Sequence, residues 1–74
     1  MAYEIAEENK AVVVFMEMMA TSYGSTMQEV RRVTVNTDRH STAVAWAKTY
    51  RGPLQGFVVM LSNRIIAMEM PPQQ

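Results

Sequence analysis

Three residues of the types used in nucleophilic catalysis lie close together in the middle of the chain. Asp38, His40 and Ser41 all occur in the segment DRHS. A catalytic triad needs side chains that converge from separate parts of a fold, next to an oxyanion hole. Near neighbours at the start of a helix point apart instead. We therefore expect Asp38 or Ser41 to cap a helix and His40 to be solvated.

Acidic and metal-binding residues offer no stronger candidate for chemistry. Glu4, Glu7 and Glu8 could form a carboxylate cluster, but a hydrolytic pair needs a pocket and a raised pKa, and the sequence predicts a solvated acidic face. That face could also mimic phosphate. His40 is the single histidine and there is no cysteine, which excludes multi-histidine sites, thiolate zinc sites and disulfides. We expect no enzyme, no cofactor and no metal.

The charged residues are divided unevenly along a chain whose formal net charge is zero. Residues 1–30 carry −4, from five glutamates and one lysine, and residues 31–64 carry +5, from six basic residues and one aspartate. Either strands from both parts mix these charges in one sheet, or the asymmetry marks a polar partner surface. Nucleic-acid binders are usually strongly basic, so we expect no tight binding of DNA or RNA.

The length and the ends of the chain bound its class and its location. At 74 residues we expect one domain, 1–74, with residues 71–74 as a flexible tail. The first ten residues are acidic, whereas a secretory signal is basic. The longest apolar run, AVVVFM, is far short of the roughly 20 residues that span a bilayer. We expect a cytoplasmic protein without membrane association.

One helix is predicted in the middle of the chain, in NTDRHSTAVAWAKTYRGP. Cap candidates precede it and a Gly-Pro stop follows it; they are Thr37, Asp38, Ser41, Gly52 and Pro53. Four residues at helical spacing form one face, namely Ala43, Trp46, Ala47 and Tyr50. We expect Trp46 and Ala47 to pack against a sheet, and the small alanines let the helix approach it closely.

A hairpin is predicted after the helix, in FVVMLSNRIIAMEM, with its turn at Ser62-Asn63. A two-residue turn pairs Met60 with Ile65 and Val58 with Ala67 on one face. It pairs Val59 with Ile66 and Phe57 with Met68 on the other face. Strands of a small antiparallel sheet usually alternate apolar and polar residues, but here both faces are apolar.

The part before the helix allows two interpretations. Residues 3–20 can form a hairpin that turns near Asn9-Lys10, or a helix; the triplet Val12-Val13-Val14 favours a strand. A turn around Gly24 then leads into a strand with a bulge near Arg31-Arg32, because Val30 is out of phase with later valines. The expected fold is α+β, an antiparallel four- or five-stranded sheet with one helix on one face, in the order (β)ββαββ.

One short helix cannot cover both apolar faces of such a sheet. A helix of about 12 residues spans only about 18 Å. Either the sheet curls around the helix and tolerates outer apolar residues, or a second molecule covers the far face. The eight methionines fit either a core or an adaptable interface.

Three segments resemble the very small phage-encoded type I anti-CRISPR proteins, several of which have one helix and an antiparallel sheet. They are YEIAEENKAVV, STAVAWAKTY and FVVMLSNRIIAMEMPP. One such family has a Ser-Asn-basic-aliphatic-aliphatic-Ala hairpin after its helix, which residues 62–67 match as SNRIIA. The resemblance covers the last two thirds of the chain better than the first.

The resemblance implies a stoichiometric inhibitor that binds a CRISPR effector complex or one of its subunits in the host cytoplasm, as a device of host defence evasion. The alternatives are a homodimeric regulator or antitoxin-like module that dimerises through the second sheet face, and a minor structural phage protein. The partner-binding candidates are Arg31, Arg32, Arg64, Val59, Ile66 and Met68.

Overall fold

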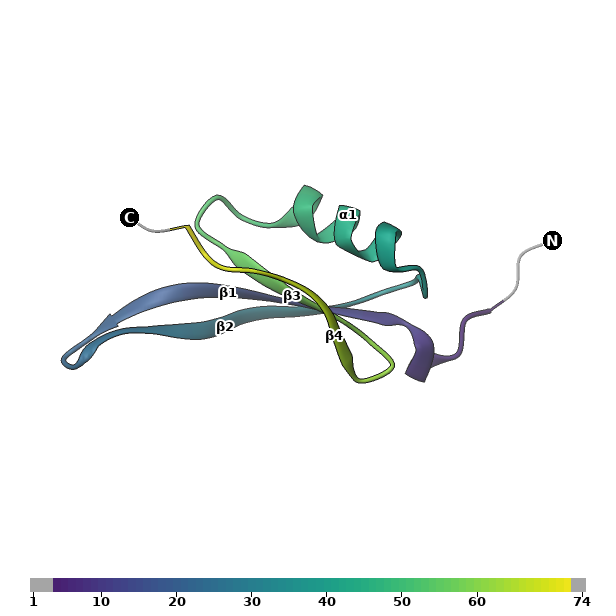
Figure 1. The fold of residues 1–74 in the computed structure, drawn as a ribbon, viewed down its shortest axis with the longest axis horizontal. Coiled ribbons are helices and arrows are strands. Elements are labelled where there is room, and N and C mark those ends of the chain that lie inside the picture. Colours follow the sequence, from purple (N-terminus) through teal and green to yellow (C-terminus); the bar gives the residue numbers. More distant parts are fainter. Residues whose placement is uncertain (1–3, 73–74) are drawn as a thin grey trace.

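The computed structural model describes residues 4–72, in which two hairpins and one helix build a single α+β unit (Figure 1). A short 3-10 turn, η1 (Glu7–Asn9), leads into the sheet. The main elements follow in the order β1 (Ala11–Thr21), β2 (Gly24–Val35), α1 (His40–Tyr50), β3 (Gly56–Leu61) and β4 (Arg64–Glu69). The predicted fold class and the order ββαββ are confirmed.

The four strands are hydrogen-bonded in the order β2-β1-β3-β4, and every neighbouring pair is antiparallel. Among the described residues, 4–6 form no strand, so the predicted hairpin turn at Asn9-Lys10 is wrong. The Ala11 N–H instead donates to the carbonyl of Thr37, at 2.8 Å. β1 pairs with β2 through a turn at Ser22-Tyr23, which Gly24 closes with a φ of +125° that favours glycine.

The sheet face toward α1 carries the core, and we call it the inner face. Its two central rows run across all four strands. They consist of Val33, Val13, Val59 and Ala67, and of Arg31, Phe15, Phe57 and Glu69. Phe15, Phe57, Val13 and Val59 are the largest fully buried side chains, so two hairpins distant in sequence supply one core.

The opposite face, which we call the outer face, is also largely apolar. Its rows across the sheet are Arg32, Val14, Val58 and Met68, and Thr34, Val12, Met60 and Ile65. Val14 and Val58 are only 7% and 9% exposed although no helix covers them. The two apolar faces that the sequence predicts for the second hairpin are therefore present.

Two bulges set which residues face which side. Phe15 pairs with Arg31 and Met16 with Glu29, so Val30 is the extra residue, beside the predicted site. The second bulge was not predicted. Met60 pairs with Ile65 as expected, but beyond it the register shifts by one residue, so that Ile66 is the extra one. The partners predicted for the three earlier β3 residues are therefore wrong. Val58 pairs with Met68, Val59 with Ala67 and Phe57 with Glu69.

The helix lies close to the sheet because its contact residues are small. Ala43 and Ala47 are fully buried, and Trp46 is partly buried against the core. The helix ends at Tyr50, just before the predicted Gly52-Pro53 stop, but the predicted N-terminal caps are wrong. The helix begins at His40, and its N-cap residue Arg39 makes no side-chain capping bond. Thr37 lies before the helix, and its hydroxyl accepts a hydrogen bond from the N–H of the N-cap residue Arg39 at 3.2 Å.

The first hairpin extends well beyond the second. β3 pairs with β1 only between Val12 and Met16, and from there to the turn β1 has β2 as its single neighbour. The result is an elongated molecule of 53 × 21 × 16 Å, with the end of the hairpin projecting at the left of Figure 1. We call residues 18–28 the arm.

The chain that follows β4 packs back over the start of β3. Pro71 is buried, and a Cβ placed on Gly56 would lie 2.6 Å from the carbonyl carbon of Met70. This contact requires glycine at position 56, and it places Pro71, the first residue of the predicted tail, against the sheet. Residues 73–74 lie outside the described part of the chain. No helix within residues 4–72 is long and apolar enough to cross a bilayer.

Candidate protein-interaction surface

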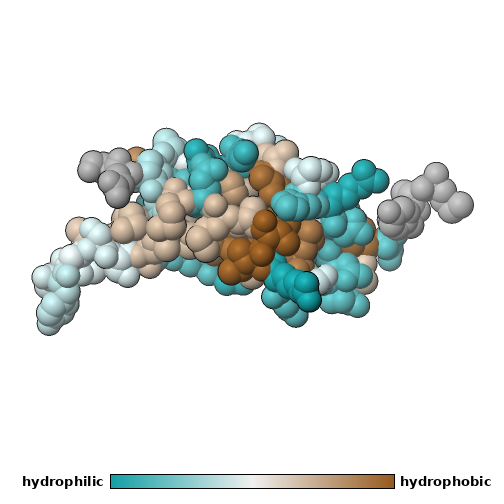
Figure 2. Space-filling model, in the orientation of Figure 1, coloured by the Kyte–Doolittle hydropathy of each residue, from teal (hydrophilic) through white to brown (hydrophobic). Residues whose placement is uncertain are grey.

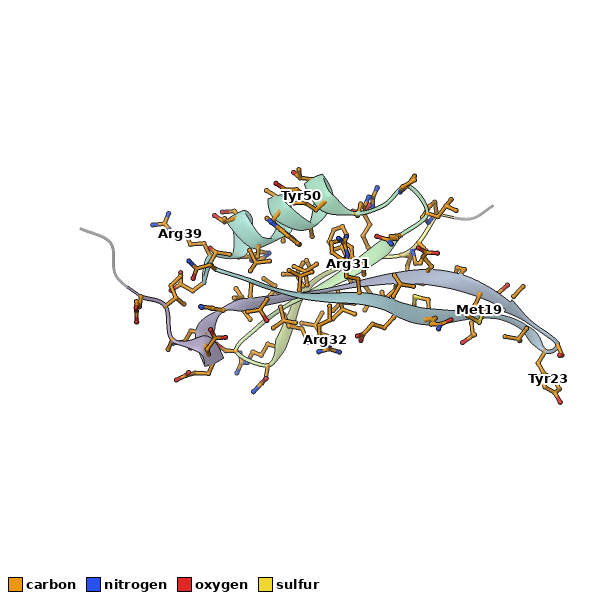
Figure 3. The ribbon with its side chains drawn as sticks, turned by 180° about the vertical axis from the view of Figure 1, so that it is seen from behind. Met19, Tyr23, Arg31, Arg32, Arg39 and Tyr50 are labelled. Carbon is orange, nitrogen blue, oxygen red and sulfur yellow. The ribbon has the colours of Figure 1, made fainter. Side chains whose placement is uncertain are left out.

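The arm carries large side chains on both of its sides and no charge. On its outer side, Met18 and Met27 lie directly opposite each other, and they are 41% and 39% exposed. On its inner side Met19 is 45% exposed. Tyr23 lies at the tip, as Figure 3 shows, and is fully exposed. Between Glu17 and Glu29 the sequence contains no charged residue.

The base of the arm is fixed to the rest of the molecule. Gln55, in the loop after the helix, donates from Nε2 to the Glu17 Oε2 at 3.0 Å. The same side chain accepts a hydrogen bond from the Gly52 N–H at 2.8 Å. At the tip, the Thr21 hydroxyl donates to the Gly24 carbonyl at 2.8 Å. The arm is thus anchored at its base and closed at its tip, and among residues 4–72 no third strand pairs with it.

The outer face continues from the arm across the second hairpin. Ile65 and Met68, both on β4, are 61% and 54% exposed. Figure 2 shows brown and tan atoms gathered over the middle of the molecule, with pale, uncharged residues toward the tip of the arm. Contiguous exposed apolar surface of this kind marks interaction sites on monomers.

Arg31 and Arg32 are adjacent in sequence but point to opposite faces of the sheet (Figure 3). The Arg31 guanidinium lies 4.1 Å from the centroid of the Phe15 ring and donates to the carbonyl of Tyr50 at 3.0 Å. Arg31 therefore ties β2 to the end of the helix. Arg32 lies on the outer face, where it forms an ion pair with Glu29 at 2.8 Å.

The Arg32–Glu29 contact shifts the titration of both groups. The hydrogen bond from Arg32, assisted by its charge, lowers the pKa of the Glu29 carboxyl, and the same contact raises the pKa of Arg32. Both side chains therefore remain ionised at neutral pH. They form a charged pair at the β2 edge of the outer face, beside the base of the arm.

The other predicted partner-binding residues occupy three different environments. Val59 is fully buried under the helix, so it is corrected from a surface candidate to a core residue. Ile66 is partly buried against that core. Arg64 and Met68 are exposed. In the second hairpin, the cross-strand pair Met60 and Ile65 faces away from the helix.

The residues considered for catalysis do not assemble into a reactive group. His40 and Ser41 form the first turn of α1 and border an open depression that also involves Arg39, Val44, Ala45 and Lys48. Among residues 4–72, no carboxylate lines this depression. Glu4 and Glu7 border a second hollow together with Lys10, which forms an ion pair with Glu7 at 2.7 Å. Within the described residues no three potential metal ligands come together.

The residues that sequence reasoning missed are those of the arm. Met18, Met19, Tyr23 and Met27 share an exposed two-stranded element, yet none was singled out as a binding residue. Two signals were available: the uncharged stretch between Glu17 and Glu29, and the greater length of the first two strands compared with the last two.

Comparison of the chain with protein-family models, curated proteins and solved structures found no match.

Proposed function

We propose that this chain is a non-enzymatic, protein-binding inhibitor that engages its target through the arm. The observation that carries the proposal is that residues 18–28 are uncharged and expose three methionines along the hairpin and a tyrosine at its tip. A two-stranded hairpin without further neighbours is only marginally stable in water. A target groove that covers Met18, Met19 and Met27 would supply the packing that the arm lacks.

The residue types on the arm suit protein recognition. Tyrosine and methionine are enriched in protein interfaces, and tyrosine is enriched among the few residues that carry most of the binding free energy. Methionine side chains adapt to irregular partner surfaces. Tyr23 at the tip would enter a pocket first, and the methionines on both sides would follow.

The proposed target is a type I CRISPR effector complex in the cytoplasm of a phage host. Support comes from the resemblance of STAVAWAKTY and of the SNRIIA hairpin to small anti-CRISPR proteins, together with the one-helix antiparallel fold. Blocking a nucleoprotein complex by stoichiometric binding requires a surface and no active site.

The test compares arm variants with a matched substitution elsewhere. Met18→Lys combined with Met27→Lys places two charges on the outer side of the arm, and Tyr23→Ala removes the tip. Ala45→Lys introduces a charge at an exposed position of the helix and is the control. Each protein is expressed in a host with active type I interference and scored by plaque formation of a targeted phage.

Wild type and the Ala45→Lys control are expected to restore plaques, whereas both arm variants fail to do so with unchanged thermal unfolding. Arm variants that inhibit as well as wild type would refute the role of the arm. If wild type restores no plaques in hosts of any type I subtype, the target is wrong. Pull-downs with wild type and arm-variant baits then identify a protein whose capture needs the arm.

Self-association is a second candidate function, and the exposure of Ile65 and Met68 on the outer face favours it. A homodimeric regulator would bury these side chains between two copies. Light scattering at micromolar concentration would give twice the monomer mass of 8.4 kDa. Ile65→Lys, on the face away from the helix, would return the monomer mass without loss of the fold.

A further inference from the structure

β4 is an edge strand, and within the described part of the chain no other strand pairs with its outer backbone edge. Such an edge offers unpaired N–H and C=O groups to another strand, and proteins often guard it with lysine or proline. Neither residue type occurs within Arg64–Glu69. The strand carries charge only at its two ends, positive at Arg64 and negative at Glu69, with four apolar residues between them.

The sequence of β4 is complementary to itself when two copies run antiparallel. A two-fold axis between Ile66 and Ala67 places Arg64 opposite Glu69 of the second copy. It also places Ile65 opposite Met68 of the second copy. Opposite charges meet at both ends, and apolar side chains meet in between, which are the cross-strand pairs that stabilise antiparallel sheets.

The bulge at Ile66 makes this pairing consistent with the two faces of the sheet. In a regular strand, residues three or five apart point to opposite faces. The extra residue changes that alternation, so Ile65 and Met68 both lie on the outer face, beside Met60 and Val58. Arg64 and Glu69 lie beside Leu61 and Phe57 on the inner face. Every facing pair therefore lies on a shared side.

The charged groups are available for this contact. Glu69 accepts a hydrogen bond from Arg51 through Oε1, and a carboxylate can accept further bonds at its second oxygen. Arg64 is exposed, and within residues 4–72 it takes part in no ion pair. At the other edge of the sheet, the basic side chains of β2 are already engaged. Arg31 donates to the Tyr50 carbonyl and Arg32 donates to the Glu29 carboxylate.

We propose that a second copy of this chain pairs with β4 edge to edge, so that two four-stranded sheets join into one of eight strands. The two-fold axis runs perpendicular to the sheet, which puts both helices on one side and directs the two arms in opposite directions. Six residues per copy make a small interface, so the dimer is weak and depends on concentration. The proposal does not depend on what the arms bind, but it would make binding by the arms bivalent.

The absence of cysteine in the sequence permits a direct test of the register by disulfide formation. Ile65→Cys and Met68→Cys are prepared as separate single variants, and both positions are exposed. In the proposed dimer these two positions are opposite each other, within the Cα distance that a disulfide requires. Because of the bulge, two copies of the same position are offset by about two regular steps, about 7 Å along the strands, and by about 5 Å across them. Their Cα atoms are then more than about 8 Å apart, which is too far.

An equal mixture of the two variants is expected to form disulfide-linked dimer at least tenfold faster than either variant alone. It should also exceed a mixture of Ile65→Cys with Met18→Cys, which pairs β4 with the arm and is the control. Arg64→Glu changes an exposed position outside the core, so this variant should keep the fold. In sedimentation experiments it should dimerise more weakly than wild type.

Three outcomes would overturn the proposal. One is a wild-type mass that stays at 8.4 kDa up to the solubility limit. Another is equal cross-linking of the single variants and the mixture, and the third is faster linking of β4 to the arm. None of these results bears on plaque inhibition by the arm, so the two proposals fail separately.

Discussion

Arg31 and Arg32 show how the sheet gives neighbouring residues of one type different roles. Arg31 stacks on the core residue Phe15 and binds the helix end at the Tyr50 carbonyl. Arg32 forms an exposed ion pair with Glu29, an interaction that contributes little to stability. The same substitution at the two positions should therefore separate a structural arginine from a surface one.

Arg31→Ala should lower the free energy of unfolding by about 1–2 kcal/mol, from the loss of a cation–π contact and a charge-assisted hydrogen bond. Arg32→Ala should leave the unfolding curve nearly unchanged. Urea titrations of the two variants and of wild type measure the difference. Equal effects would show that Arg31 does not hold the helix end.

Gly56 is the residue at which the fold tolerates no side chain. A Cβ there would overlap the backbone of Glu69, Met70 and Pro71, and backbone atoms cannot move aside as the end of a flexible side chain can. Gly56→Ala should destabilise the protein by about 3 kcal/mol or more, at or above the upper end of the range for overpacking.

Gly52→Ala is the matched control for Gly56→Ala. Its Cβ would approach only the side chain of Gln55, at 3.0 Å, and that side chain can move. We expect less than about 1 kcal/mol of destabilisation, as for tolerated changes of volume. Comparable urea midpoints for the two variants would contradict the close packing of the Glu69–Pro71 backbone against Gly56.

At the scale of elements, the helix is held by the small size of its contact residues. Ala47 is fully buried against the sheet, whereas Ala45 is exposed on the same helix. Ala47→Leu should cost about 1–3 kcal/mol because the added atoms have no space, and Ala45→Leu should be nearly neutral. Thermal unfolding decides between them: an Ala47→Leu protein that melts at the wild-type temperature would place that face away from the sheet.

The arm should be the least protected part of the sheet. Its amides pair across one hairpin only, and its side chains bury little, whereas β1 near Val13 lies between two strands under the helix. Local opening costs less where few apolar contacts must be broken. Amide hydrogen exchange should be about 10-fold or more faster at Met19 than at Val13. Equal protection would mean that the arm is packed, for instance against a second copy.

The order of the elements and the side of the helix that packs on the sheet could be predicted from the sequence, because both depend on local periodicity. Ala43 and Ala47 followed from their spacing, and they are buried. The bulge at Ile66 was missed since no glycine or polar residue marks it. The side of the sheet that Arg31 occupies depends on the Val30 bulge and on pairing with distant β1, which local patterns do not specify.

At the scale of the whole molecule, the projecting arm makes the fold longer than a typical chain of this size. The Cα radius of gyration is 13.7 Å, compared with about 11 Å for a compact domain of 74 residues. The core occupies the part in which all four strands meet, and the arm lies outside it. The buried core and the exposed methionines of the arm therefore lie in different parts of the molecule.

The distribution of charge over this elongated shape argues against nucleic acid as the partner. The formal net charge is zero, and Arg31, Arg32 and Arg51 are engaged within the molecule. Little basic surface is left to displace counterions, which supply most of the affinity of non-specific binders. The uncharged arm adds nothing to such an attraction.

Affinity for mixed-sequence duplexes and single strands should therefore be no tighter than ordinary non-specific binding, with a Kd on the order of 10⁻⁴–10⁻⁶ M at physiological salt. Fluorescence anisotropy measures it, and Arg39→Gln combined with Lys48→Gln, both exposed, tests the basic residues of the helix. That variant should bind as weakly as wild type. Nanomolar binding that falls steeply with salt and is lost in this variant would instead make the helix a nucleic-acid contact, and the inhibitor proposal would give way to a regulator.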